Sequence, residues 1–179
     1  MWQKLNRYYP FRLEIIPVLI LFLAWYIAVS NYPSLPEQIP MHFNAGGVVD
    51  GWGSPSSVFL GPIIGLFFYL LLTFICALFC FVPDPTTLIN LPRQRLVKLS
   101  PESAQKLIRV ISRTLFCLKI IELALVLYLV YITIEIAFDR AHGLGFGFPL
   151  IFIAILVLVF YLVWQSFHLT AAPKNKLLR

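Results

Sequence analysis

The chain has 179 residues, of which 60% are hydrophobic and 12% are charged, and its net charge at pH 7 is +6. Soluble domains carry about a quarter charged residues, so this composition excludes an ordinary soluble domain and predicts an integral membrane protein. The positive charge does not indicate nucleic-acid binding, because the basic residues lie in segments that flank apolar runs. We therefore expect the lipid bilayer to be the main partner, and no nucleic acid.

Four segments are long and apolar enough to cross a membrane, because a spanning helix needs about 20 mostly apolar residues. They are residues 11–30, 58–82, 114–138 and 148–170. The first run is longer than the apolar region of a secretory signal, and no clear cleavage site of small residues follows it, so we expect it to remain as a helix. The sequence predicts an all-α integral membrane protein, a four-transmembrane-helix bundle in which residues 1–179 form a single membrane domain.

The basic residues are distributed asymmetrically between the segments that join these spans. Of the 14 Lys and Arg residues, all but Lys119 and Arg140 lie in the N-terminal segment, in the basic connection of residues 83–113 or in the C-terminal tail. Short cytoplasmic loops hold an excess of Lys and Arg. We therefore expect a multi-pass protein of the cytoplasmic membrane with both termini cytoplasmic, and with the loop of residues 31–57 on the exterior side.

The basic connection contains a helix-start signal. Ser100 suits the N-cap position and Pro101 the first helical position. The apolar and basic residues that follow recur at helical spacing. We expect a helix that either continues into the third span or rests on anionic lipid headgroups, and the continuous helix is the slightly favoured interpretation.

The loop of residues 31–57 has the composition of a shaped segment. Its prolines fix φ, whereas its glycines allow the positive φ that tight turns need. It has no Lys or Arg, and it retains apolar side chains that a solvated loop has little reason to keep. We predict a structured loop for recognition or for packing over the helix ends, defined by Pro36, Pro40, His42, Phe43, Asn44, Gly46, Gly47, Asp50 and Trp52.

The order of residues in this loop resembles the signature of a known family. The pattern runs through Leu35-Pro36, Ile39-Pro40, His42-Phe43, Gly46-Gly47 and Asp50. It is similar to the domain of unknown function 1648, the membrane domain of bacterial toxin-immunity proteins of the Sdp type. The resemblance covers the first helix, the loop and the start of the next helix, although this chain has Pro55 where members often have Lys. It implies a non-enzymatic membrane protein whose partner is an apolar peptide toxin.

Several ionisable residues near the exterior end of the spans are candidates for a common site beneath the loop. They are His42, Asp50, Glu135, Asp139, Arg140 and His142. Imidazole and carboxylate groups are suitable ligands for zinc and other transition metals, which makes His42 and Asp50 the candidates for a metal site. The spacing matches no recognised metal, phosphate-binding or nucleophile motif, so we expect no metal and no cofactor.

A structural interpretation of the same residues stands beside the metal hypothesis. His42 and Asp50 would bond the loop to itself, because lone loop histidines often orient backbone through hydrogen bonds. Asn44 and the adjacent glycines would form the turn, and Trp52 would lie at the membrane interface.

Ionisable residues within a span are costly, so each needs an explanation. They are Glu14, Lys119, Glu122 and Glu135, with His168 near the end of the fourth span. Lys119 and Glu122 are three residues apart on one helix, and we predict that they pair. With Glu14 and His168 they could share one depth, either as a packing network or as a proton or substrate path.

Three functions compete at this point. The first is a non-enzymatic membrane protein whose exterior loop recognises an apolar peptide toxin or another membrane protein. The second is an accessory subunit of a larger complex, for which Gly61 and Gly65 in the second span offer a close-packing face. The third is a membrane enzyme or transporter with its site beneath the loop, ranked last because the loop shows no nucleophile with a base relay.

Overall fold

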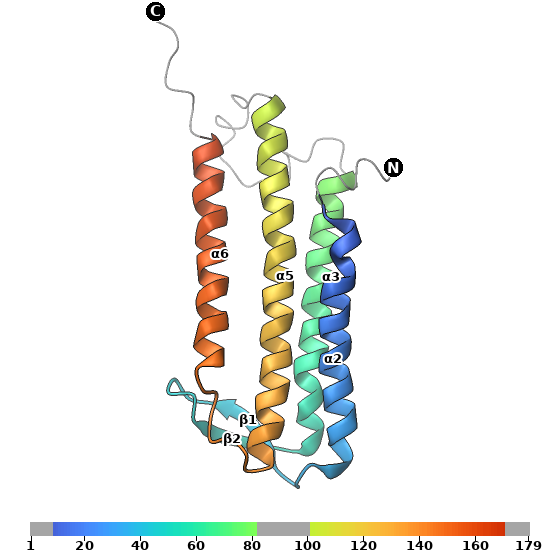
Figure 1. Ribbon diagram of the computed structural model, residues 1–179, viewed down its shortest axis with the longest axis vertical. Helices are drawn as coiled ribbons and strands as arrows, with labels where there is room; N and C mark the ends of the chain where they lie inside the picture. The colour runs from blue at the N-terminus through green and yellow to red at the C-terminus, as the bar shows by residue number, and fades with distance from the viewer. Residues whose placement is uncertain (1–8, 82–100, 171–179) are drawn as a thin grey trace, which may run out of the picture.

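The computed structural model describes residues 9–81 and 101–170 (Figure 1). Its elements in chain order are the 3₁₀ helix η1 (Phe11–Glu14), helix α2 (Ile15–Asn31), the 3₁₀ helix η2 (Tyr32–Ser34), strands β1 (Ile39–Phe43) and β2 (Val49–Gly53), the 3₁₀ helix η3 (Pro55–Phe59), and helices α3 (Leu60–Phe81), α5 (Pro101–Ala137) and α6 (Gly147–Thr170).

Four helical segments in this part of the chain are long and apolar enough to cross a membrane. The prediction of a four-helix, all-α membrane protein is therefore confirmed. The two-stranded antiparallel sheet of β1 and β2 is an addition that the sequence analysis missed. It forms at one end of the bundle, beside the end of α5 and the start of α6 (Figure 1).

Helix α5 is the longest element and extends the third span. Its 37 residues run without interruption from Pro101, and at 1.5 Å per residue they measure about 55 Å. This length exceeds the bilayer's hydrocarbon core of about 30 Å, so the continuous-helix interpretation is confirmed. The predicted N-cap, Ser100, lies outside the described residues, as does most of the basic connection.

Helix α5 is also the centre of the bundle. It packs against α2, α3 and α6. It also contacts β1 of the two-stranded sheet, which we call the β-hairpin. Helix α6 has its main contacts with α5 and lies on the side away from α2 and α3 (Figure 1). No residue in the most apolar part of α6 is buried inside the protein.

Close approach of α3 and α5 depends on two glycines. A Cβ added to Gly61 would lie 2.8 Å from Cγ2 of Val130, and one added to Gly65 would lie 3.2 Å from Cγ1 of Val126. Val126 and Val130 belong to the main apolar core, with Ala24 and Ala28 of α2. The Gly-x-x-x-Gly face is therefore used inside the chain, and its predicted use against other subunits is wrong.

Gly61→Leu should destabilise the bundle by about 1–3 kcal/mol, because it forces a side chain into a packed helix contact. Thermal unfolding in detergent measures the change. Adding Val130→Ala to the same chain should recover part of the loss. The control is Ile63→Leu on the same helix, where the side chain is 51% exposed. Equal unfolding temperatures for Gly61→Leu and the control would contradict the close contact.

Candidate functional site

The loop that carries the family pattern folds as an irregular β-hairpin of β1 and β2. In its register Ile39 faces Gly53, Pro40 faces Trp52 and Phe43 faces Val49, with irregularities on both sides of His42. These irregularities are bulges, which increase twist and re-aim side chains. Pro40 removes a ladder donor, a loss that strands tolerate at edges and bulges.

The hairpin turn is organised by Asn44. Its side-chain Oδ1 accepts hydrogen bonds from the backbone N–H groups of Gly46 at 2.9 Å and Val48 at 3.1 Å. The backbone N–H of Gly47 donates to the carbonyl of Asn44 at 2.9 Å, and Gly47 has a φ of +74°. An Asn side chain that bonds nearby backbone and a glycine at positive φ are typical of tight turns, so this segment supplies the turn that the sequence predicted.

His42 and Asp50 bond to each other across the two strands. His42 Nδ1 lies 2.5 Å from Asp50 Oδ1, and the two side chains are 73% and 43% exposed. A polar pair this exposed is worth at most about 1 kcal/mol. The pair therefore links the strands locally but contributes little to the stability of the whole fold.

The hairpin is anchored to the bundle by apolar side chains. Ile39 is fully buried in the core that contains Val58 and Val130. Phe43 and Val49 pack against a second cluster, which includes Ile132 of α5. Burying a side chain of this size contributes about 1.5–3 kcal/mol, so these contacts hold the hairpin more firmly than the exposed pair of His42 and Asp50 does.

The connection between α5 and α6 clamps the hairpin tip. The backbone N–H of Leu144 donates to the carbonyl of Gly47 at 2.8 Å, and the hydroxyl of Tyr128 donates to the carbonyl of Leu144. A Cβ on Gly143 would lie 2.6 Å from the carbonyl oxygen of Gly47. The glycines of this connection therefore allow it to approach the hairpin backbone closely.

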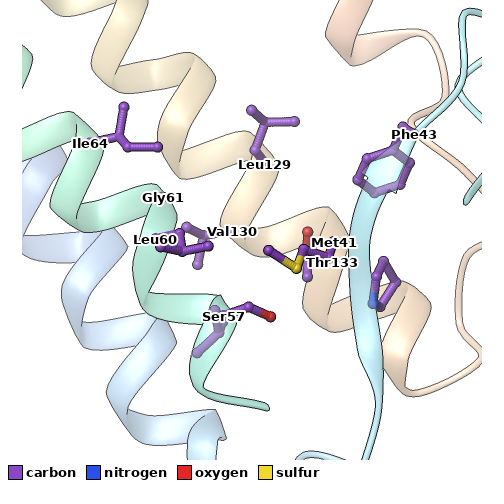
Figure 2. Close-up of a pocket in the computed structure, with 11 residues that line it drawn as sticks. Met41, Phe43, Ser57, Leu60, Gly61, Ile64, Leu129, Val130 and Thr133 are labelled. Carbon is purple, nitrogen blue, oxygen red and sulfur yellow. The ribbon is translucent and has the colours of Figure 1, made fainter. Parts of the chain in front are cut away.

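Two adjoining pockets lie beneath β1. The first, of about 280 Å³, is lined by Pro40, Met41, Phe43, Ser57, Val58, Leu60, Gly61, Ile64, Leu129, Val130 and Thr133. Figure 2 shows this pocket between the strand, with Met41 and Phe43, and the helices, with Ile64 on α3 and Leu129 on α5. The second, of about 580 Å³, is lined by Met41, His42, Phe43, Asn44, Ala45, Gly46, Gly47, Leu129, Leu144, Gly145, Phe148 and Pro149.

The predicted convergence of ionisable groups beneath the loop does not occur as a metal centre. Glu135 pairs with Arg140 at 3.3 Å, separately from the pair of His42 and Asp50. Within residues 9–81 and 101–170 no group of three or more His, Cys, Asp or Glu side chains could hold a metal ion. His42 and Asp50 therefore form an isolated pair, without a third ligand in the described chain.

A polar network lies within the bundle, toward the end opposite the hairpin. Lys119 is fully buried, and its Nζ donates to Glu14 Oε1 at 2.6 Å, Tyr9 Oη at 2.7 Å and Thr73 Oγ1 at 2.8 Å. Tyr69 donates its hydroxyl to Glu14 Oε2 at 3.1 Å. All three ammonium donors and both carboxylate oxygens are thus satisfied, as a buried charge pair requires.

The predicted pair of Lys119 with Glu122 is wrong, because Lys119 turns toward α2 and α3 and pairs with Glu14. Glu122 is half-buried, and its Oε2 has no hydrogen-bond partner among the described residues. His168 is exposed on α6 and lies beside the Trp164 ring, with 6.1 Å between ring centroids. The predicted cluster is therefore reduced to the pair of Glu14 and Lys119.

Tyr9, Tyr69 and Thr73 are members of this network that the sequence analysis missed. The available signal was the spacing of Tyr69 and Thr73, four residues apart in an apolar span and so on one helix face. A buried Lys needs several acceptors, and hydroxyl groups at its depth are the acceptors that an apolar span can offer.

These features define a multi-span helical membrane protein whose bundle is capped at one end by a β-hairpin. Residues 19–66 match the family model described as "Domain of unknown function (DUF1648)". The match covers most of α2, the whole hairpin and the start of α3, the region in which the sequence pattern indicated this family. No curated protein and no solved structure matches the chain.

Lys119→Met should destabilise the protein by about 3–5 kcal/mol, because it leaves the Glu14 carboxylate inside the bundle without its cation. Lys119→Met combined with Glu14→Gln should be less destabilised than Lys119→Met alone. A double-mutant cycle of thermal or denaturant unfolding in detergent measures the coupling. Additive effects of the two substitutions would show that the pair makes no joint contribution.

Proposed function

We propose that this chain is a non-enzymatic protein of the cytoplasmic membrane whose hairpin recognises an apolar peptide or protein on the exterior side, in the manner of bacterial toxin-immunity proteins. The observation that carries the proposal is the apolar surface of the hairpin. Met41, Val48 and Trp52 are 57%, 54% and 54% exposed, and Met41 also lines both pockets. Exposed apolar groups beside a concave surface are typical of binding sites.

The rigidity of the hairpin supports recognition. Its base is held by the buried Ile39, and its tip is bonded to Leu144. A surface that is ordered before binding loses less conformational entropy in the complex. The hairpin therefore has the properties of a preorganised binding element supported by a helical scaffold.

The charge of the hairpin favours an apolar or a basic ligand over an acidic one. Residues 31–57 contain Glu37 and Asp50 but no Lys or Arg. The resemblance to immunity proteins favours a peptide toxin as the ligand, and the match of residues 19–66 supports the family part of that resemblance.

Binding accounts for the site better than catalysis does. The pair of His42 and Asp50 has the chemistry of a general base, but in the described part of the chain no hydroxyl or thiol bonds to His42. The nearby hydroxyl of Ser54 bonds instead to Ser56 at 2.8 Å. General-base catalysis requires a nucleophile or a positioned water within reach, so we assign His42 and Asp50 to the linkage of the strands.

A role as accessory subunit of a larger complex is the second candidate. The observation that favours it is the exposure of α6, on which Phe160 and Trp164 are 71% and 63% exposed. Lipid would cover the same surface equally well, so this candidate ranks below recognition by the hairpin.

The proposed orientation predicts where engineered thiols can be labelled. Ala45→Cys at the hairpin tip should react with a membrane-impermeant maleimide in intact cells, whereas Glu102→Cys at the other end of α5 should react only after permeabilisation. Both positions are exposed. The unsubstituted chain gives the background from its native cysteines. Labelling of Glu102→Cys alone in intact cells would reverse the orientation.

The recognition function predicts a loss of protection. A strain of the source organism that lacks the gene should be outgrown by its parent in mixed culture, and a plasmid with the wild-type gene should restore its growth. Met41→Ser with Trp52→Ser should fail to restore it, because these substitutions remove the exposed apolar contacts. Glu37→Gln with Gln38→Ser is the control at exposed polar positions of the same loop. Equal growth of the deleted strain and its parent would count against immunity.

A further inference from the structure

Glu122 is an ionisable group that neither the fold nor the hairpin uses. It lies within the apolar part of α5 and is half-buried. One of its carboxylate oxygens, Oε2, is shielded from solvent and has no hydrogen-bond partner in residues 9–81 and 101–170. Ionisable groups in a membrane span are costly and mark functional sites more often than packing positions. Its neighbour Lys119 is already saturated by Tyr9, Glu14 and Thr73, so this carboxylate needs another partner.

The face of α5 on which Glu122 lies can be inferred from the residues seven positions away on either side. A helix returns to nearly the same face after seven residues, so Leu115, Glu122 and Leu129 share one face. Leu115 packs against the cluster that contains Phe79 of α3 and is joined by Leu162 of α6. Leu129 lines one pocket with α3 and the other with the start of α6. Glu122 therefore lies on the face of α5 between α3 and α6, which we call the seam.

At the hairpin end of the seam, the first pocket is lined by apolar residues apart from Ser57 and Thr133. Seven residues of helix rise by about 10 Å, so Glu122 lies about 10 Å deeper than the pockets beneath the hairpin. Ile64 of α3 and Leu129 of α5 line the pocket of about 280 Å³ (Figure 2). On the other side, α6 offers apolar side chains, and its polar residues lie at its C-terminal end.

The spanning helices of a second copy of this chain offer no free cation to Glu122. Lys119 is the single Lys or Arg in α2, α3, α6 and the part of α5 from residue 114 onward, and it is already paired with Glu14. A cation that pairs with Glu122 at this depth would therefore come from a different molecule. Lipid amines lie at the headgroup level, above the hydrocarbon that surrounds this part of α5.

We propose that the seam of α5 between α3 and α6 docks a membrane-spanning helix of another protein, and that Glu122 receives a Lys or Arg side chain of that helix. Charge complementarity identifies the partner, because an apolar helix with one buried cation is the element that satisfies a lone carboxylate in hydrocarbon. This partner site is distinct from the hairpin surface, and it would make the chain a subunit of a membrane complex.

The test uses the full-length chain in lipid nanodiscs and a synthetic leucine–alanine helix of about 20 residues with a central Lys. The matched probe has Leu at that position. Energy transfer between a donor on the peptide and an acceptor on an added C-terminal tag reports binding. We expect the Lys peptide to bind about tenfold more tightly than the Leu peptide, the scale of one charge-assisted hydrogen bond in a bilayer.

Glu122→Gln should abolish this preference without lowering the unfolding temperature, because no internal partner is lost. Glu135→Gln is the matched control, since Glu135 pairs with Arg140 at the hairpin end. Equal binding of the two peptides, or an unchanged preference in Glu122→Gln, would overturn the proposal. Energy transfer between two labelled copies of the chain would also overturn the proposal if it persists when the Lys peptide is added. The seam would then mediate self-association.

A lipid occupant is distinguished in the same assay. If lipids with amine headgroups fill the seam, the preference for the Lys peptide should appear only in nanodiscs that lack them, and this result would overturn the helix assignment. Persistence of the preference in both lipid compositions supports it. The growth test of the hairpin is independent of these outcomes, because it depends on Met41 and Trp52 and not on Glu122.

Discussion

The buried ammonium group of Lys119 is the constraint on which the arrangement of the bundle depends. An unpaired charge inside a membrane protein costs several kcal/mol, and this one is satisfied by groups from three segments: Tyr9 and Glu14 before α2, Thr73 on α3, and Lys119 itself on α5. The network therefore fixes the rotation and depth of α2 and α3 relative to α5. Helix α6 contributes no member of it, which agrees with its peripheral position.

The opposite end of the bundle is held by apolar contacts. Ile39 enters the core between the helices, and Phe43 packs on the end of α5. The connection before α6 then bonds to the hairpin tip through Leu144. The polar network and these apolar contacts therefore hold opposite ends of the bundle, and the hairpin is part of the main core through Ile39. Such a scaffold lets exposed side chains such as Trp52 serve binding without having to maintain the fold.

Composition and periodicity were sufficient to predict the four helices, because spanning segments are set by the length of an apolar run. The pairing of Lys119 was not predictable in this way. Glu122 is three residues away, whereas Glu14 is 105 positions away, and a local rule selects the nearer carboxylate. The direction in which a side chain leaves its helix decides between them, and that direction depends on how α2, α3 and α5 pack.

The hairpin escaped sequence analysis for a different reason. Pro40, Gly51 and Gly53 are residues that ordinary strands disfavour, so the segment was interpreted as a loop. In the structure the same residues permit the bulged pairing, since a Cβ on Gly51 would lie 2.9 Å from the Cβ of His42 and one on Gly53 would lie 2.7 Å from Sδ of Met41. The turn around Asn44 was predictable because its chemistry is local, whereas the contacts of the strands with α5 are not.

Lys119 and Glu122 differ in what they contribute to the stability of the fold. Both residues lie on α5, three positions apart, yet one has every donor satisfied and the other has an oxygen without a partner in the part of the chain that the structure describes. Removal of Lys119 would leave the buried carboxylate of Glu14 without a cation, so stability explains the presence of Lys119. An apolar residue could occupy the position of Glu122 without the loss of any internal bond, and the bilayer would favour that exchange. Stability within the described residues therefore gives no reason for a carboxylate at this position, and this is the physical basis of the proposed partner site.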